Sequence, residues 1–443
     1  MINGGLHFIT PVWGREYTRC FVDVCLPSLL APGNIPSLKS EGQCVYNIYT
    51  TPDDLMVIQN APAFELLRRC LPVFFHPISQ KVEQITNQYF VQSDCYRRGI
   101  RAAGEADAGI MFLNADVVVA DGGIQGLTKI LRSGKRAILA LGIRLNKNGV
   151  TTLLLEHHRS SAGAVISVKP RELAALALPN MHQITKAHLF HGEGEDMHPA
   201  GLFWRVGDEG LLAHCFHLHP LVVCPTVKNA PFSITIDEDY LMTSCPDTND
   251  HYIIQDSDEF LACELTDETR KINTFPRTND LREIARWAHF NANTSHRVLI
   301  RHAIKIHAGQ SDLSAWSETE MEAQKVVEEV LAHLRSDVEA RSELVMNNVL
   351  RPTQGSSEAA EREESFGELL AEQTRLAKAF ARRARDYLAT KGVVRQQLPF
   401  SIIKVAGALL IVGAFVCLRL SVRAYRKIHN FLDQIPSRKL FLV

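Results

Sequence analysis

The chain has 443 residues, a formal net charge of −1 and 46% hydrophobic residues, which is enough apolar material for a large buried core. A disordered or fibrous protein is excluded, because such chains lack this apolar content. The 48 Lys and Arg residues are balanced by 49 Asp and Glu residues. Nucleic-acid binders need a surplus of basic side chains to neutralise phosphates, so we expect no nucleic-acid partner.

The ten cysteines are scattered through apolar runs, and no two of them have CxxC spacing. This pattern predicts buried thiols in a reducing compartment and argues against a disulfide framework. The first residues, Met1–His7, contain no basic stretch followed by an apolar one, which is the pattern of a secretory signal. We therefore expect the folded part of the chain to be cytoplasmic.

Short apolar runs alternate with helical patterns through about the first 200 residues, which predicts an α/β domain with a largely parallel sheet. The expected strands are Leu6–Pro11, Val45–Thr50, Val73–Pro77, Gly109–Leu113 and Ala137–Ile143. The expected helical stretches between them are Tyr17–Leu30, Asp53–Leu67 and Gln84–Gly104.

The remainder of the chain divides by composition into further segments. After an α/β domain over residues 1–265 we predict a helical extension over 266–350, a polar linker over 351–360 and a charged helix over 361–397. An apolar helix over 398–424 and a short basic tail over 425–443 follow. Pairing of two chains through Glu318–Val338 or Glu361–Thr390 is left open, because neither stretch holds a strict heptad for long.

The apolar helix is the clearest physical signal in the sequence. Val405–Leu418 is wholly apolar, and snorkelling of Lys404 and Arg419 extends it to Leu398–Leu420, about the length that a bilayer requires. Basic residues flank it on both sides, so the positive-inside rule does not choose between a spanning and an in-plane helix. A buried core helix is the alternative. We favour membrane contact, because little chain remains beyond the linker to form a core.

An acidic side chain follows the apolar run Gly109–Leu113, which leads into Asn114-Ala-Asp116. A buried strand that ends on an acidic residue presents its carboxylate at the carboxyl edge of the sheet, where α/β proteins bind ligands. A hard cation there can bridge the carboxylate to phosphates. Turns after strands also favour Asn and Asp, and on spacing alone this alternative explains the pair equally well.

The segment Gly109–Gly123 resembles the D-x-D motif of glycosyltransferases with the A-type fold, and His7–Tyr17 is similar to the strand and loop with which these enzymes hold the nucleoside. The resemblance spans about Leu6 to Pro225. It implies nucleotide-binding roles for Thr10, Pro11, Trp13 and Tyr17, and for Asp94 or Arg97 on the helix before Asn114, where an exposed ion pair is the alternative.

The same resemblance implies a Mg²⁺ or Mn²⁺ site at Asn114 and Asp116. Asn114 departs from the motif, because it offers a neutral carbonyl oxygen in place of a carboxylate, which weakens the expectation of metal dependence. His219, alone or with His217, could complete such a site with Asp116. Histidines satisfied by ordinary hydrogen bonds are the alternative that we favour.

A second acidic pair, Asp208-Glu209, is similar to the pair at the start of the acceptor-side helix of inverting glycosyltransferases. Direct displacement at the anomeric carbon requires a base for the acceptor hydroxyl, and a carboxylate at a helix N-terminus suits that task. A helix cap made by Asp208 is the alternative. Trp204 and Arg205 would flank an acceptor sugar or a phosphate.

These observations lead to one hypothesis and two rivals. We expect a glycosyltransferase A-type fold docked on the cytoplasmic membrane face, which transfers a sugar from a nucleotide diphosphate-sugar to a lipid-linked or polysaccharide acceptor. The first rival is an inactive scaffold of the same fold, which Asn114 favours. The second is a nucleotidyl or phosphoryl transferase, which ranks third because no Gly-rich phosphate loop followed by Lys occurs.

Overall fold

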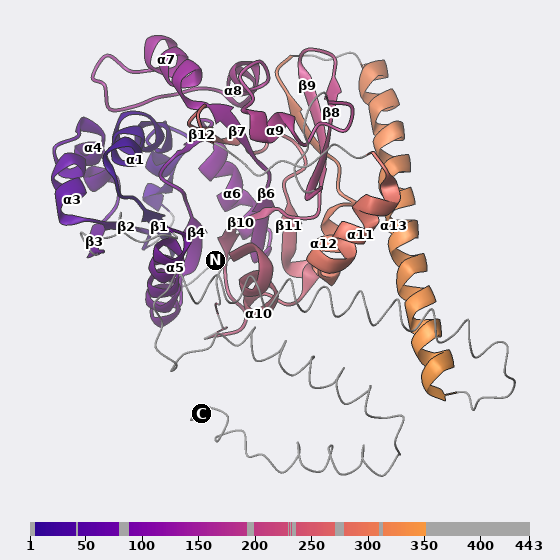
Figure 1. Cartoon of the computed structure of the whole chain (residues 1–443). Helices are drawn as coiled ribbons and strands as arrows, with labels where there is room; N and C mark the ends of the chain where they lie inside the picture. Colours follow the sequence, from indigo (N-terminus) through magenta and orange to yellow (C-terminus); the bar gives the residue numbers. More distant parts are fainter. Residues whose placement is uncertain are drawn as a thin grey trace, which may run out of the picture. The chain divides into compact units, whose positions relative to one another are not determined.

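The computed structural model describes residues 5–40, 43–78, 88–192, 199–228, 230, 232, 236–270, 279–309 and 313–350 (Figure 1). The chain divides into two compact units, Met1–Ala340 and Arg341–Val443. The sheets, cores and candidate sites described below belong to the first unit.

A seven-stranded sheet forms the centre of the first unit, with the order β11-β6-β10-β4-β1-β2-β3. Strand β10 is antiparallel to both neighbours, and every other neighbouring pair in the sheet is parallel. The predicted α/β class with a mostly parallel sheet is thus confirmed. The strands are β1 (Leu6–Pro11), β2 (Val45–Thr50), β3 (Val73–Pro77), β4 (Gly109–Phe112), β6 (Ala137–Ala140), β10 (His219–Val223) and β11 (His251–Ile253).

Three predicted strands, β1, β2 and β3, match their residues in full. The predicted helix Asp53–Leu67 is wrong, because the structure has two helices, α3 (Pro52–Gln59) and α4 (Pro62–Cys70). Pro62 causes the break, since it cannot donate a helical hydrogen bond and its ring clashes with the preceding turn. It instead occupies the first position of α4, where no such donor is needed.

The predicted strand Ala137–Ile143 is also wrong as a single element. It divides into β6 and β7 (Gly142–Asn146), which belong to different sheets. In a three-stranded sheet, β7 pairs in parallel with β12 (Ala262–Thr266), and β12 pairs antiparallel with β5 (Val117–Val119). A third sheet contains β8 (Gly201–Val206), β9 (Gly210–Cys215) and β13 (Ile304–His307).

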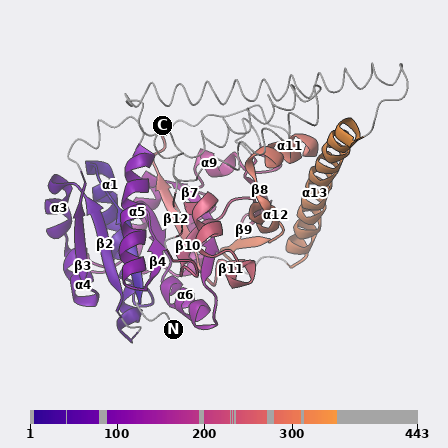
Figure 2. The same cartoon turned by 90° about the horizontal axis from the view of Figure 1, so that it is seen from below.

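Helices cover the sheets and close two hydrophobic cores. Figure 2 shows α5 (Gln88–Glu105) running alongside the central strands, where it contacts β1 and β4. In the second core, Trp204, Leu212 and Phe216 of the β8–β9 hairpin region pack against α11 (Leu281–Asn291) and α13 (Leu313–Leu350). The other α-helices are α1 (Arg15–Cys20), α2 (Leu26–Leu29), α6 (Gly123–Arg132), α7 (Lys147–His157), α8 (Pro170–Ala177), α9 (Gln183–Lys186), α10 (Leu241–Ser244) and α12 (Thr294–Leu299).

The predicted helical extension over 266–350 contains helices α11, α12 and α13 and also strand β13, which pairs with β9. Among the helices that the structure describes, none has the length and apolar character needed to cross a membrane. The predicted linker, the charged helix and the apolar segment Leu398–Leu420 lie outside the described residues. Their roles in membrane contact and chain pairing stay predictions.

Gly99 sets how closely α5 can approach the central sheet. A Cβ atom at this position would lie 2.3 Å from Cδ1 and 2.9 Å from Cγ1 of Ile9, a fully buried side chain of β1. We predict that Gly99→Ala lowers the free energy of unfolding by about 1–3 kcal/mol through overpacking, despite the better helix propensity of Ala.

Gly104 in the same helix is the matched control for urea denaturation of the two variants. A Cβ atom there meets nothing within 4 Å, so Gly104→Ala should leave the stability unchanged or raise it by up to about 1 kcal/mol. Equal stabilisation by both substitutions would show that α5 is not held against Ile9.

Candidate functional site

The loop after β1 is fixed by the carboxylate of Asp54. Its oxygens accept hydrogen bonds from the backbone N–H of Gly14 at 3.0 Å, from Thr18 Oγ1 at 2.8 Å and from Thr51 Oγ1 at 2.6 Å. Gly14 has φ 82°, a conformation that favours glycine. The loop is therefore held in one shape at the carboxyl edge of the sheet.

The structure places the predicted nucleotide-binding residues of this region in different environments. Thr10 is fully buried at the end of β1 and shares a 2.9 Å hydrogen bond with Tyr46 Oη. Pro11 is the buried last residue of β1, and Trp13 Nε1 donates to Gln88 Oε1 at 2.7 Å. Tyr17 is 48% exposed, so of these four side chains it is the one most available to a ligand.

Asp116 is buried in the segment between β4 and β5, next to β12 of the sheet that contains β5, β12 and β7. Its backbone carbonyl accepts a 2.8 Å hydrogen bond from Leu265 N, which brings it next to Glu264 in β12. Glu264 is in register with Arg144 of β7, and the two side chains form an ion pair. Arg144 Nη1 also donates to Thr266 Oγ1 at 3.3 Å.

Arg270 adds a second guanidinium to this region. Its charge acts on both Asp116 and Glu264, and its Nη2 donates to Tyr89 Oη at 3.4 Å. We call Asp116, Glu264, Arg144 and Arg270 the acid–arginine cluster. It combines two carboxyl groups with two guanidinium groups at the carboxyl edge of the central sheet.

Burial and proximity alter the ionisation of the cluster. Burial, followed by the neighbouring Glu264 carboxylate, raises the pKa of Asp116 to about 7, although Arg144 opposes the change. Burial also raises the pKa of Glu264, against the attraction of Arg144 and Arg270 and a hydrogen bond with Asp116. Burial and then Asp116 raise the pKa of Tyr17, whose phenol therefore lies within the field of the cluster. The site offers a carboxyl group that can exchange a proton near neutral pH and guanidinium groups that can bind phosphate oxygens.

The residues predicted to hold Mg²⁺ or Mn²⁺ do not fit a metal site. Asn114 Oδ1 accepts hydrogen bonds from Tyr96 Oη at 2.8 Å and Gln92 Nε2 at 2.9 Å, which occupy both lone pairs of the carbonyl oxygen. His219 Nε2 lies 3.2 Å from the backbone oxygen of Phe112, to which it donates. Asp116 is the third residue of the predicted set, and its carboxyl group belongs to the acid–arginine cluster.

Asp94 and Arg97 form an ion pair with each other on α5, with Nη1 and Oδ1 3.1 Å apart. Both side chains are exposed, and the Arg97 guanidinium also lies over the Phe232 ring, 5.7 Å from its centroid. This arrangement agrees with the ion-pair alternative. A nucleotide contact from either residue stays a prediction.

The helix predicted to begin at Asp208 and Glu209 is wrong, because the two residues lie in the turn of the β8–β9 hairpin. Gly207, at φ 56°, permits the tight turn between two apolar strands. Both acidic residues are exposed, and their role as general base stays a prediction without the helix that suggested it.

The two residues predicted to flank the acceptor differ in exposure. Trp204 is 3% exposed and packs between Phe190 and His214, with ring centroids 5.3 and 5.9 Å away. Its ring faces are therefore covered by the second core, which rules out stacking on an acceptor sugar in this conformation. Arg205 is exposed on β8, so a phosphate could reach it.

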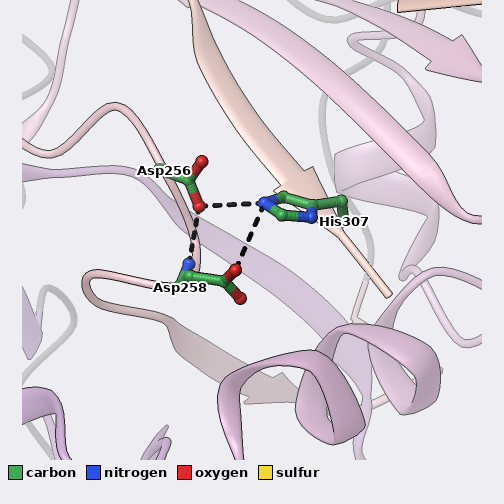
Figure 3. Close-up of side chains that lie close together, drawn as sticks. All are labelled: Asp256, Asp258 and His307. Carbon is green, nitrogen blue, oxygen red and sulfur yellow. Dashed lines mark hydrogen bonds and ion pairs between the residues drawn. The ribbon is translucent and has the colours of Figure 1, made fainter. Parts of the chain in front are cut away.

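A separate group combines Asp256, Asp258 and His307, which follow β11 and end β13 (Figure 3). His307 Nε2 lies 2.9 Å from Asp256 Oδ1 and 3.9 Å from Asp258 Oδ2, so the three side chains could hold a hard cation. Arg171 of α8 already donates to both oxygens of Asp258, at 2.7–3.1 Å. This guanidinium binds both oxygens of Asp258 and offsets the charge of that carboxylate, which disfavours a cation at this group.

A cavity of about 400 Å³ is bounded by β11 and α12 and lined by side chains that include Asp237, Gln255 and His302. Residues of the acid–arginine cluster do not line it.

Three residues of the acid–arginine cluster, Arg144, Glu264 and Arg270, were not predicted from the sequence. Glu264 did carry a signal, because it is the single charged residue in the otherwise apolar run Leu261–Leu265. Arg144 followed a run that was assigned to one strand, and Arg270 carried no pattern of its own. His307 was also missed, although the Asp256-Ser-Asp258 spacing was visible.

The raised pKa of Asp116 predicts a loss of stability with rising pH. The unfolded group ionises near 3.8 and the folded group near 7, so its contribution is complete below the unfolded value and is lost as pH rises through the folded one. Between pH 5 and pH 8 the wild type should lose about 1–3 kcal/mol through this group. Asp116→Asn, which cannot ionise, should remove that part of the loss in urea denaturation at the two pH values.

Asp94→Asn, an exposed change on α5, is the control and should keep the wild-type pH dependence. A fall as steep in Asp116→Asn as in the wild type would show that Asp116 ionises normally in the folded chain.

Comparison with known proteins found no matching family model and no matching curated protein. Among solved structures, S. aureus TarS is similar with a TM-score of 0.28 and 10% identity, over 67% of this chain and 42% of TarS. Mouse xyloside xylosyltransferase 1, in its apo form, is similar with a TM-score of 0.19 and 17% identity, over 36% of this chain and 61% of that enzyme. The chain thus spans less than two thirds of the length of either protein.

Proposed function

We propose that the chain is a glycosyltransferase that takes a sugar from a nucleotide diphosphate-sugar. The observation that carries this proposal is the acid–arginine cluster at the carboxyl edge of β4. Parallel strands β1 and β4 end together there, as the 3.1 Å hydrogen bond from Leu113 N to Ile9 O indicates. Ligands of open α/β sheets bind at this edge, so the loop after β1 and the cluster would face the same donor.

The cluster has the chemistry that the reaction requires at the leaving group. In sugar transfer the bond between the anomeric carbon and the diphosphate oxygen breaks, and a bond to the acceptor oxygen forms. Negative charge develops on the departing diphosphate, and the guanidinium groups of Arg144 and Arg270 are suited to stabilise it. The proton of the acceptor hydroxyl must pass to a base, for which Asp208 and Glu209 are the predicted residues.

We propose a lipid-linked or polysaccharide acceptor at the cytoplasmic membrane face. The support is the apolar segment Leu398–Leu420, whose length and flanking basic residues suit membrane contact. Such an anchor would raise the effective concentration of a membrane-bound acceptor near the site without new contacts.

An inactive scaffold of the same fold is the second candidate. It is favoured by Asn114, which stands at the first acidic position of the predicted motif and whose carbonyl oxygen is engaged by Tyr96 and Gln92. A scaffold of this kind would not recognise nucleotide sugars.

Thermal unfolding of the full chain with UDP- and GDP-sugars distinguishes the two candidates. We predict that at least one donor raises the stability by about 3 kcal/mol at 100 times its Kd, because it binds only the folded state. The same donor should release its nucleoside diphosphate when acceptor lipid or glycan is supplied.

Arg144→Met should abolish the stabilisation by removing a phosphate contact. Arg69→Met, which removes an exposed ion pair with Glu65 on α4, should leave it unchanged. The absence of a shift with every UDP- and GDP-sugar would favour the scaffold.

A further inference from the structure

The cluster departs from the metal-dependent arrangement that the D-x-D resemblance implies. A divalent cation at Asn114 would need its carbonyl oxygen, and that oxygen already accepts two hydrogen bonds. Tyr96, one of the two donors, is 5% exposed and packs edge-on against Phe112, with centroids 5.2 Å apart. Freeing the oxygen would take away the acceptor of this buried hydroxyl, which would keep the hydrogen bond that it accepts from Gln92 Nε2 at 3.1 Å, and a buried donor without an acceptor is costly.

The charges around Asp116 also oppose a divalent cation. Glu264 is neutralised by its ion pair with Arg144, and Asp116 and Glu264 share a hydrogen bond. Arg270 brings a second positive charge close enough to act on both carboxyl groups. Hard cations bind where several carboxylates lack positive partners, and this cluster offers the opposite arrangement.

The same arrangement suits an anion. The Arg144 guanidinium makes its described contacts, to Glu264 and Thr266, through Nη1, and 27% of the Arg144 side chain is exposed. Among the described residues, the side chain of Arg270 makes one long hydrogen bond, 3.4 Å to Tyr89 Oη. Guanidinium groups bind phosphate oxygens in pairs, and Arg144 is held in position by Glu264 before any ligand arrives.

We propose that Arg144 and Arg270 bind the donor's diphosphate directly, so that nucleotide binding needs no divalent cation. This inference rests on the proposed function and specifies how its donor site recognises the diphosphate. Arg144, which Glu264 holds in position, binds one phosphate, and Arg270 binds the other.

Calorimetric titration of the full chain with UDP and GDP tests the inference, once with EDTA and once with Mn²⁺. At least one nucleotide should bind with a Kd that differs less than about threefold between the two conditions. Arg270→Met should weaken that binding at least about tenfold, and Arg69→Met on α4 should not change it.

Arg144→Met leaves Glu264 without its ion-pair partner, so the double variant Arg144→Met/Glu264→Gln is included to remove both charges. Circular dichroism checks the fold, and Arg270→Met alone decides the matter if neither Arg144 variant folds. Binding that requires Mn²⁺ and tolerates Arg270→Met would overturn the inference and leave the proposed donor site standing. The absence of binding with and without Mn²⁺ would overturn both.

Discussion

The ion pair between Arg144 and Glu264 is the interaction on which the candidate site depends. Glu264 lies in a strand whose other side chains are largely buried, and a carboxylate in such a place needs a positive partner. The parallel register of β7 and β12 supplies it, because Arg144 and Glu264 are paired positions. Once Glu264 is fixed, the backbone bond from Leu265 places Asp116 beside it.

Other buried carboxylates fix the loops around this centre in a similar way. Asp54 holds the turn after β1, and Asp121 accepts from Gly33 N at 2.7 Å and from Ser167 Oγ at 2.8 Å. These hydrogen bonds contribute to lowering the pKa of Asp121. Asp121 is thus satisfied by donors, whereas burial, followed by the charge of the neighbouring Glu264 carboxylate, raises the pKa of Asp116. This contrast marks Asp116 as a functional candidate and Asp121 as a structural residue.

The sequence predicted the strands that stand alone between turns, and it failed where the apolar pattern was ambiguous. Val45–Thr50 is followed by Thr51-Pro52, and Val73–Pro77 is preceded by Pro72 and ends in a proline, so these limits were visible. The run through Ala137–Ile143 has no such boundary, because Leu141 continues the apolar pattern between two sheets. Asp208 and Glu209 resembled the start of a helix, yet the pairing of β8 with β9 determined the local structure.

The candidate site was predicted only in part, because one of its residues has a local sequence signal and its partners do not. Asp116 follows a buried strand, and the exit of such a strand can be recognised within a few residues of sequence. Its partners Arg144 and Glu264 are separated by 120 positions and meet only through the pairing of β7 with β12. A single sequence carries no local signal of that pairing, so the arginines that define the electrostatics were found only in three dimensions.

The position of β12 has a consequence for how the protein is made. Strands β5 and β7 leave the ribosome well over a hundred residues before their shared partner, and a pairing with such a long intervening segment forms slowly. Four adjacent strands of the central sheet, β1 to β4, can assemble during that interval. Asp116 then lacks its neighbour Glu264, because β12 has not yet been synthesised. Nascent chains would therefore contain this part of the sheet before they contain the acid–arginine cluster, which is complete only after the segment through Arg270 has been synthesised.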